Sequence, residues 1–425
     1  MNKKKLFTKD FTLVIIGQII SLFGNAVLRF ALPLYLLRET DSSSLFGAVT
    51  ACSFIPMVIF SLFGGVIADR VNKRNIMVTL DFCTAGIIII FGLLLGKLPL
   101  VPLMTAVLMI LYGISGAYQP SVQASIPLLA EGENLMKGNA AINMVSTLSG
   151  LLGPVIGGVL YGSFGIEPVL FVSVICFTIS AVMELFIHIP YIKPEKNINV
   201  FRAVSGDLRE SFAFVKNEKP VFISVVVLLA LFNLVLSAAM VVGIPVMVVQ
   251  FLGMSDAALG IAQGAMGLGG LAGGLLAGAF AQRLKLKDSY IPLVICSVAA
   301  LFMGISLLDG IPQVVSFAVI SAMCFAAMCA STMFSVAMLT VVQQQTPPQL
   351  LGKIMAAIMA VSGCSHPIGQ AAYGLLFEAF SDMPYAVMIG SAVLAFVISI
   401  YSRRVFVRLA EADFSDETAK QPSVQ

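Results

Sequence analysis

The chain has 425 residues, of which 59% are hydrophobic and only 11% are charged. Soluble domains carry roughly 25% charged residues, so a water-soluble fold with this composition would leave large apolar patches exposed. The composition therefore excludes an ordinary soluble domain and predicts an integral membrane protein. We interpret the net charge of +3 as a signal of membrane topology rather than of nucleic-acid binding, and no nucleic acid partner is expected.

Twelve segments are apolar and long enough to cross a bilayer as helices, which takes about 20 residues each. In chain order they are residues 11–37, 45–68, 76–96, 101–128, 138–162, 168–189, 220–249, 256–283, 290–308, 312–343, 352–380 and 384–407. These segments predict an all-α integral membrane protein. Lys and Arg are concentrated in the loops on one side, which is therefore expected to be cytoplasmic. Both termini then lie in the cytoplasm, and the multi-pass chain is surrounded by the lipids of the cell (inner or plasma) membrane.

A pattern of glycine, proline and arginine occurs twice along the chain. Gly47 recurs as Gly260, Gly65 as Gly278, Arg70 as Arg283 and Pro154 as Pro367, always at the same separation. A duplicated half of about six spans is a recurring transporter plan. We predict two six-helix bundles, residues 1–189 and 220–407. A cytoplasmic linker with an amphipathic helix, residues 190–219, joins them, and residues 408–425 form a cytoplasmic tail.

The second predicted span ends in a charged motif, because residues 64–74 read GGVIADRVNKR. This segment resembles the loop between spans 2 and 3 of the major facilitator superfamily, G-x-x-x-D-R-x-x-R-R. The resemblance implies twelve spans in two bundles. It also places Gly65, Asp69, Arg70 and Arg74 in a cytoplasmic gate that locks two helix ends until the transporter changes state. The second copy has Gln282 in place of the acid.

The fifth span contains GLLGPVIGG at residues 150–158. It resembles the G-P-x-x-G-G core that is associated with exporting, antiporting members of the superfamily. Glycines flatten a helix face for close packing, and a proline permits a bend. We expect this face to meet a glycine-rich face of the eighth span in a sliding gate, with static packing as the alternative. The gate positions are Gly153, Pro154, Gly157 and Gly158 on span 5 and Gly264 and Gly267 on span 8.

Further segments resemble the twelve-span drug:proton antiporters of the macrolide-efflux and enterobactin-exporter type. They include DLRE at residues 207–210, Gln119 with Pro120, and Gly352 with Lys353. The similarity covers nearly the whole chain and implies a monomer that exchanges a small-molecule substrate for protons. One departure is that residues 111–113, Leu-Tyr-Gly, stand early in span 4 where the resemblance predicts an arginine.

Polar residues on helical stripes are the candidate substrate-cavity groups, because spans 1, 4, 7 and 10 line the central cavity in the superfamily. They are Gln18, Asn25 and Arg29 on span 1, Tyr112, Gln119 and Gln123 on span 4, and Asn233 and Ser237 on span 7. Each is as consistent with helix–helix contact as with substrate binding. Arg29 stands apart because an uncompensated charge within the bilayer is costly and usually faces water or a partner. The alternative for Arg29 is that it reaches the lipid headgroups.

Acids within the predicted spans are few, and Asp81, Glu184 and Glu378 are the candidates for proton coupling. For Asp81 and Glu184 we favour the interpretation that the side chains simply reach the cytoplasmic interface.

The sequence favours a secondary transporter, a proton-coupled exporter of amphipathic or lipophilic compounds that works by alternating access. The alternatives are a specific metabolite or siderophore exporter or importer and, from another class, a membrane scaffold or sensor or an intramembrane enzyme. The chain has no His-Glu-x-x-His, Gly-x-Ser-x-Gly or phosphate-loop motif. None of its seven cysteines has metal-ligand spacing. Neither catalysis nor a cofactor is therefore expected.

Overall fold

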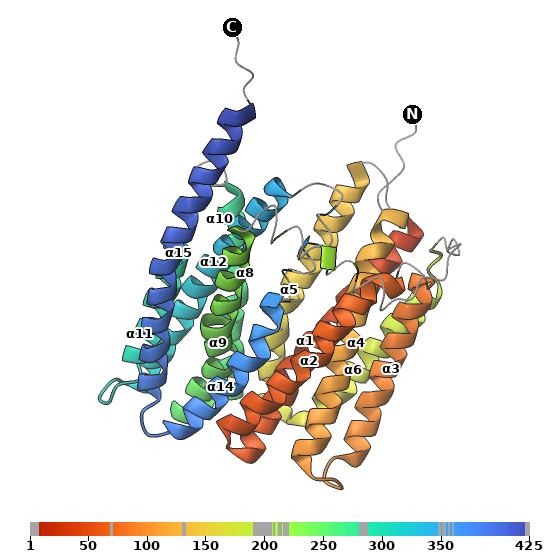
Figure 1. The fold of residues 1–425 in the computed structure, drawn as a ribbon. Coiled ribbons are helices and arrows are strands. Elements are labelled where there is room, and N and C mark those ends of the chain that lie inside the picture. The colour runs from red at the N-terminus through yellow and green to blue at the C-terminus, as the bar shows by residue number, and fades with distance from the viewer. Residues whose placement is uncertain are drawn as a thin grey trace. The chain divides into compact units, whose positions relative to one another are not determined.

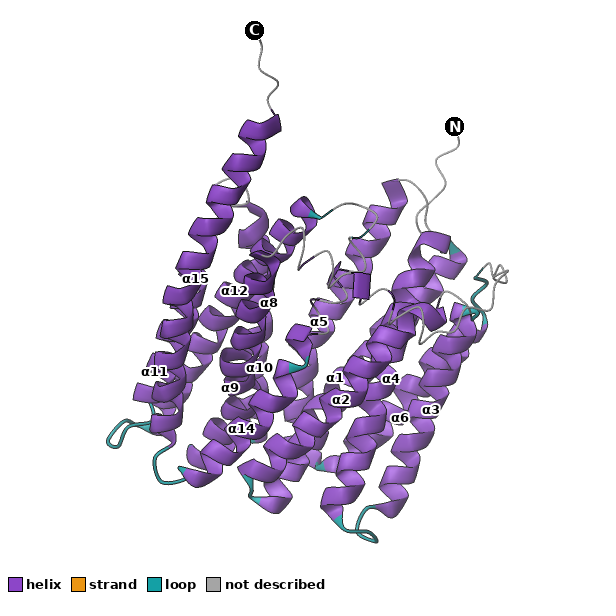
Figure 2. Cartoon of the chain, viewed as in Figure 1, coloured by secondary structure: helices purple, strands orange, loops and turns teal. Residues whose placement is uncertain are grey.

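The computed structural model describes residues 8–68, 71–129, 133–189, 206, 209–210, 215, 221–279, 288–346, 350, 354–355, 358 and 361–420. Across these residues the secondary structure consists of helices, turns and loops, without a strand (Figure 2). Lipid offers no hydrogen-bond partners, so an apolar segment crosses it most readily as a helix, which satisfies its own backbone groups. The all-α prediction is confirmed.

The helices follow one another along the chain, coloured from red at the N-terminus to blue at the C-terminus (Figure 1). The first six are α1 (Lys9–Thr40), α2 (Ser43–Ala68), α3 (Lys73–Leu94), α4 (Leu100–Leu129), α5 (Glu133–Phe164) and α6 (Ile166–Leu185). The next span comprises α8 (Val221–Phe232), η1 (Asn233–Ser237), α9 (Ala238–Pro245) and η2 (Val246–Phe251). The last five are α10 (Asp256–Ala279), α11 (Ile291–Ile305), α12 (Gln313–Gln345), α14 (Ser365–Ala379) and α15 (Pro384–Lys420).

Ten helices among the described residues are long and apolar enough to cross a membrane. They match ten of the twelve predicted spans. The predicted ninth span, 290–308, corresponds to the shorter apolar helix α11, which has 15 residues. The eleventh, 352–380, is described mainly through α14, so the count of twelve stays a prediction. Most of the linker, including its expected amphipathic helix, lies outside the described residues.

The seventh span is continuous but not uniformly α-helical. Two short π-helical stretches interrupt it, one of 5 residues (η1) and one of 6 residues (η2). Pro245 directly precedes η2, and a proline removes a backbone donor from a helix, so the sequence carries a local reason for the second stretch. π-helical turns within α-helices are frequent at functional sites.

The described residues form two compact units. Unit 1 comprises Met1–Gly206, Pro245–Gly264 and Gln370–Glu378, and unit 2 comprises Asp207–Ile244, Ala265–Gly369 and Ala379–Gln425. In unit 1, α1 packs against α5 and α6, α3 against α4 and α6, and α2 against α4. In unit 2, α11 packs against α12 and α15. Unit 1 thus contains the first predicted bundle together with two short segments from the second.

Two glycine pairs join these short segments closely to the rest of unit 1. A side-chain carbon added to Gly158 on α5 would lie only 3.1 Å from the Cα of Gly260 on α10. One added to Gly47 on α2 would lie 2.7 Å from the Cα of Gly374 on α14. The backbones approach so closely that a larger residue would push them apart. Gly47 and Gly260 are also the first pair of the sequence repeat, so the repeated glycine makes a close helix contact in both copies.

Candidate functional site

Arg29 in α1 contacts the aromatic ring of Tyr112 on α4. Its guanidinium carbon lies 4.0 Å from the ring centroid, which is a cation–π contact. Its Nη2 lies 3.9 Å from the Sδ of Met57 on α2. One helical turn earlier, the side-chain amide of Asn25 donates to the hydroxyl of Ser115 on α4 at 3.0 Å. Three helices of unit 1 thus bring together a cation, an aromatic ring, a thioether and an amide.

The space beside Arg29 is small in this conformation. A cavity of about 10 Å³ is lined by Asn25, Arg29, Tyr112, Thr84 of α3 and apolar side chains of α1, α4 and α6, which is room for about one water molecule. Within the described part of the chain, no carboxylate lies within ion-pairing distance of Arg29. Within the described residues the contact found for the guanidinium N–H groups is the one with Met57, so most of its five donors have no described partner and could bind a polar or anionic ligand.

Tyr112 belongs to the segment where the resemblance to drug:proton antiporters predicts an arginine. The structure brings a guanidinium to this segment from a different helix, because Arg29 of α1 covers the Tyr112 ring. The positive charge is thus present beside span 4 even though span 4 itself does not supply it.

A larger cavity of about 220 Å³ lies within unit 2. Its lining includes Phe232, Leu236, Ser237, Met240, Met266 and Met328. Methionine and aromatic side chains adapt to ligands of varied shape. Of the two polar residues that we predicted on span 7, Ser237 lines this cavity, whereas the Asn233 amide donates to the backbone carbonyl of Ser362 at 3.1 Å.

Asp81 on α3 and Glu184 on α6 are buried, with relative exposures of 2% and 0%. Our interpretation that these side chains reach an interface is therefore wrong. The Tyr118 hydroxyl on α4 donates to Oε1 of Glu184 at 2.8 Å, and Nε2 of Gln18 donates to the Tyr118 hydroxyl at 2.6 Å. The Ser21 hydroxyl donates to Oδ1 of Asp81 at 3.1 Å. Gln18, which we predicted for the cavity, instead belongs to this buried network.

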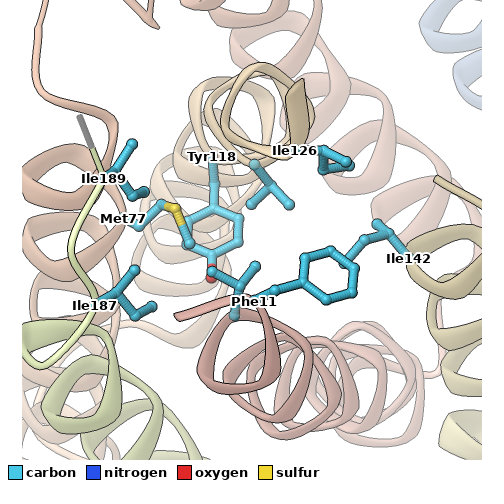
Figure 3. Close-up of a cluster of buried hydrophobic side chains, with 9 residues drawn as sticks. Phe11, Met77, Tyr118, Ile126, Ile142, Ile187 and Ile189 are labelled. Carbon is cyan, nitrogen blue, oxygen red and sulfur yellow. The ribbon is translucent and has the colours of Figure 1, made fainter. Parts of the chain in front are cut away.

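An apolar cluster surrounds the ring of Tyr118 (Figure 3). Its buried members are Phe11, Val14, Met77, Tyr118, Val122, Ile126, Ile142, Ile187 and Ile189. The Tyr118 ring packs within the cluster, while its hydroxyl leaves the cluster to bind Glu184. One residue therefore joins the apolar core of unit 1 to the buried acids.

The predicted gate motif at the end of α2 is described only in part. Asp69 and Arg70 lie outside the described residues, as does the environment of Gly65 within α2. The Arg74 guanidinium donates to the carbonyl of Leu185 at the end of α6. Arg74 thus ties α3 to α6 within unit 1, and the gate role of the motif stays a prediction.

The glycines of the fifth span divide between two neighbours. A side-chain carbon at Gly153 would lie 2.3 Å from the Cβ of Ala26, and one at Gly157 would lie 3.1 Å from the ring of Phe30. Both glycines therefore face α1, and the expectation that they meet the eighth span is wrong. Gly158, one residue further round the helix, makes that contact.

The eighth span approaches α5 through successive turns of α10. A carbon at Gly260 would lie 2.5 Å from the carbonyl oxygen of Pro154, and one at Gly264 would lie 2.6 Å from the Cγ2 of Val155. Pro154 and Gly264 thus take part in the predicted contact between spans 5 and 8. Gly267, further along α10, is half-buried and belongs to unit 2.

The remaining predicted residues have other surroundings. Gln119 is half-buried and Gln123 is exposed on α4. Glu378 is also exposed, and its Oε2 accepts hydrogen bonds of 3.2 Å from the Ser42 and Ser43 hydroxyls and from the backbone N–H of Ser44. A carboxylate at the N-terminus of α2 is stabilised by the helix dipole. These contacts assign Glu378 a capping role, unlike that of the buried acids.

Two further polar links lie next to the Glu378 contacts. Nη2 of Arg38 lies 2.8 Å from Oδ1 of Asp256, and the Gln250 amide donates to Oδ1 of Asp41 at 3.2 Å. We call the Arg38–Asp256, Asp41–Gln250 and Glu378–serine contacts the loop clamp. It joins the connection between α1 and α2 to the segments that unit 1 takes from the second half.

The sequence predictions missed the loop clamp as well as Tyr118 and Ser115. The clamp residues have no local pattern, because their partners are more than 200 positions apart. Ser115 and Tyr118 did carry a signal, because with Tyr112 they are spaced at three-residue intervals along α4. That spacing places them near one another on the helix surface.

A family model described as Major Facilitator Superfamily matches residues 14–370. Macrolide efflux protein A of Streptococcus pyogenes is 21% identical over 402 residues, which cover 94% of this chain and 96% of the relative. Enterobactin exporter EntS of Salmonella typhimurium is 26% identical over 371 residues, covering 86% of this chain and 84% of the relative.

Solved structures agree on the fold. The nucleoside transporter NupG superposes with a TM-score of 0.74 at 14% identity, covering 95% of this chain and 99% of that one. A bacterial homologue of the iron transporter ferroportin in an inward-facing state gives a TM-score of 0.70 at 17% identity, covering 95% and 98%. The family model spans most of the sequence and the fold agrees with it. The chain therefore belongs to the major facilitator superfamily and is a multi-pass membrane transporter, not an enzyme.

Proposed function

We propose that this transporter is a proton-coupled exporter of amphipathic or lipophilic compounds, macrolide-like drugs among them, and that it works by alternating access. The observation that carries the substrate class is the cavity of unit 2, whose lining includes Phe232, Met240, Met266 and Met328. Such a lining accepts apolar surfaces of varied shape. Within unit 1, the Arg29 site is a separate place where a polar group can bind.

The similar proteins support export over import. One is named a macrolide efflux protein and another an enterobactin exporter. Both are distant, at 21% and 26% identity, so the substrate must be argued from the residues of this chain. We propose that the protein lies in the cell membrane as a monomer, with both termini in the cytoplasm.

The contacts of α5 with α10 and of α2 with α14 are compatible with a transporter that changes conformation during its cycle. The glycine pairs let smooth backbones lie against each other without interlocking side chains. The loop clamp adds polar links that are individually weak, because an exposed ion pair contributes about 0–1 kcal/mol. Arg38 and Asp256 are 37% and 17% exposed, so we expect this link to open at a small cost in free energy.

A second candidate is an exporter of one acidic metabolite. Arg29 favours it, because no acid among the described residues neutralises its guanidinium, and a planar guanidinium binds carboxylate-like groups through two parallel hydrogen bonds. The relative that is named an enterobactin exporter makes a siderophore the first compound to test in this class.

The experiment is an accumulation assay in a bacterial host that lacks its own efflux pumps. Erythromycin, ethidium and an anionic siderophore serve as probes, each with and without a proton uncoupler. We expect the protein to lower the accumulation of erythromycin and ethidium, and the uncoupler to remove this effect. An effect on the siderophore alone would favour the second candidate.

Variants of the cavity test which site selects the substrate. Met328→Ala enlarges the unit 2 cavity, so the order of preference among probes should change. Met144→Ala is the matched control because Met144 on α5 is 71% exposed. If the inserted wild-type protein changes the accumulation of no probe, the proposed function is wrong.

A further inference from the structure

Unit 1 contains buried acids that the substrate sites do not use. We define Asp81 and Glu184 as the carboxyl pair. We propose that the carboxyl pair, held by Gln18, Ser21 and Tyr118, binds the one proton that is exchanged for substrate in each cycle. This inference rests on the proposed function and assigns its coupling ion to a site.

The hydrogen-bond network around the carboxyl pair has more acceptors than donors. Oε1 of Gln18, Oδ2 of Asp81 and Oε2 of Glu184 are all buried without a partner. Leaving a buried polar atom unpaired costs about 1–3 kcal/mol. A proton on either free carboxyl oxygen turns an unpaired acceptor into a donor.

The groups that face the carboxyl pair are almost all neutral. From α1 they are Gln18, Ser21 and the backbone of Gly17, where an added side-chain carbon would lie 3.8 Å from Oε1 of Glu184. From α4 the facing group is the Tyr118 hydroxyl, and from α6 it is the Ser180 hydroxyl, which lies beside Asp81 and donates to the carbonyl of Gly17 at 3.1 Å. The two carboxyl groups are also close enough to interact electrostatically.

The charged groups nearest along these helices bind elsewhere. Arg74 of α3 donates to the carbonyl of Leu185, and Asp10 of α1 accepts from the backbone N–H of His188 at 2.9 Å. Within the described ranges, neither member of the carboxyl pair has a cation at ion-pairing distance. Two ionised carboxylates would therefore be buried without a described cation to balance them, which is expensive within a membrane protein.

The position of the carboxyl pair allows its protonation to affect the substrate site. Gln18 and Ser21 bind the pair network, while Asn25 and Arg29, further along α1, form the site at Tyr112. At 1.5 Å per residue, Ser21 and Arg29 are about 12 Å apart along the helix axis. A shift of α1 as a rigid element would therefore move both sites together.

The coupling step changes only O–H bonds. In the buried state the pair holds one proton and carries one negative charge in total. When unit 1 admits water, the O–H bond breaks, the proton passes to water, and the solvated pair carries two negative charges. A proton from the opposite side then re-forms one O–H bond before the pair is buried again. The apolar cluster around Tyr118 seals the network between these steps (Figure 3).

The test uses the full chain in liposomes with radiolabelled erythromycin. Uphill accumulation driven by a pH gradient requires proton exchange, whereas exchange of erythromycin across the membrane without a gradient does not. We expect Asp81→Asn and Glu184→Gln to reduce gradient-driven accumulation to the level of protein-free liposomes while erythromycin exchange continues. Glu167→Gln is the matched control, because Glu167 lies on the same helix as Glu184 but is exposed.

Infrared spectroscopy detects the bound proton directly and does not depend on the transport of erythromycin. The wild-type protein should show the C=O stretch of a buried protonated carboxyl group at neutral pH. Glu184→Gln or Asp81→Asn should shift or remove this band, and Glu167→Gln should leave it unchanged. Gradient-driven transport that persists in both pair variants, or the absence of the band in wild type, overturns the inference. A wild-type protein that has the band but moves none of the transport probes contradicts the proposed function instead.

Discussion

Arg29 is held by the face of an aromatic ring, and no described acid neutralises it. A cation–π contact contributes about 0.5–1 kcal/mol when exposed and about 2 kcal/mol when desolvated. This stabilisation is smaller than the cost of burying a guanidinium without hydrogen bonds. A ligand with a hydrogen-bond acceptor can therefore compete with Tyr112 for the guanidinium. The carboxyl pair presents the opposite case, because its network lacks a donor rather than an acceptor.

Substitution of Arg29 should separate the role of charge from that of geometry. Arg29→Ala should abolish transport or change which probes are accepted, at near-normal protein level. Arg29→Lys keeps the charge but loses the planar donor fork, so it should retain part of the activity. The measurement is uptake into energised membrane vesicles.

A second arginine–tyrosine contact provides the control for that experiment. Arg403 on α15 lies over Tyr290 at 5.7 Å, and its side chain is exposed. Arg403→Ala should leave transport rates and probe preference unchanged. Wild-type behaviour of Arg29→Ala would mean that Arg29 only positions α1.

At the scale of elements, α1 is shared by most of the described sites. It packs against α5 and α6. Its residues Gln18 and Ser21 belong to the hydrogen-bond network of the carboxyl pair, and its Arg29 contacts the ring of Tyr112. The contact between α5 and α10 is of another kind, because glycine backbones meet there without side chains. Such a contact tolerates sliding but not added bulk.

Enlarging Gly158 should damage the contact between α5 and α10. A side-chain carbon there would lie 2.6 Å from the carbonyl oxygen of Asp256, and overpacking typically costs about 1–3 kcal/mol. We expect Gly158→Leu to lower the thermal unfolding temperature in detergent and to stop transport. Gly150→Leu on the same helix should be tolerated, since nothing lies within 4 Å of that position. Equal effects of the two variants would exclude steric contact as the cause.

At the scale of the whole molecule, we expect the loop clamp and the membrane topology to govern how the transporter changes state. The clamp connects the α1–α2 loop to segments 250–256 and to Glu378. Each link is weak. We therefore expect the fraction of molecules in which the loop clamp is formed to depend on all three links together.

Removing the clamp in steps should shift that population gradually. Arg38→Ala alone should change it by less than about tenfold, since an exposed pair contributes about 0–1 kcal/mol. Adding Glu378→Gln should shift it further. The readout is the labelling rate of a cysteine at Ala257, beside Asp256, after replacement of the seven native cysteines. Unchanged labelling in the double variant would mean that the clamp does not hold the state.

The charge asymmetry of the loops predicts a definite topology. Reporters fused after Lys97 and Asp309 should be exported, and those after Arg74 and Lys196 should stay in the cytoplasm. The comparison of alkaline phosphatase and fluorescent-protein fusions measures this directly. A cytoplasmic reporter at Lys97 would contradict the twelve-span arrangement.

The sequence by itself determined the all-helical fold, the places of most spans and the family, because these depend on composition, local periodicity and short motifs. It also predicted Arg29 and Tyr112 as site residues, though not that they touch.

Tertiary structure decided the rest. Asp81, Tyr118 and Glu184 lie on three different helices, and only the rotation of each helix against its neighbours buries them together. Successive residues of an α-helix differ by about 100° in direction. The periodic pattern therefore located the glycine-rich face of span 5, but the packing of α1 and α10 decided that Gly157 faces one and Gly158 the other.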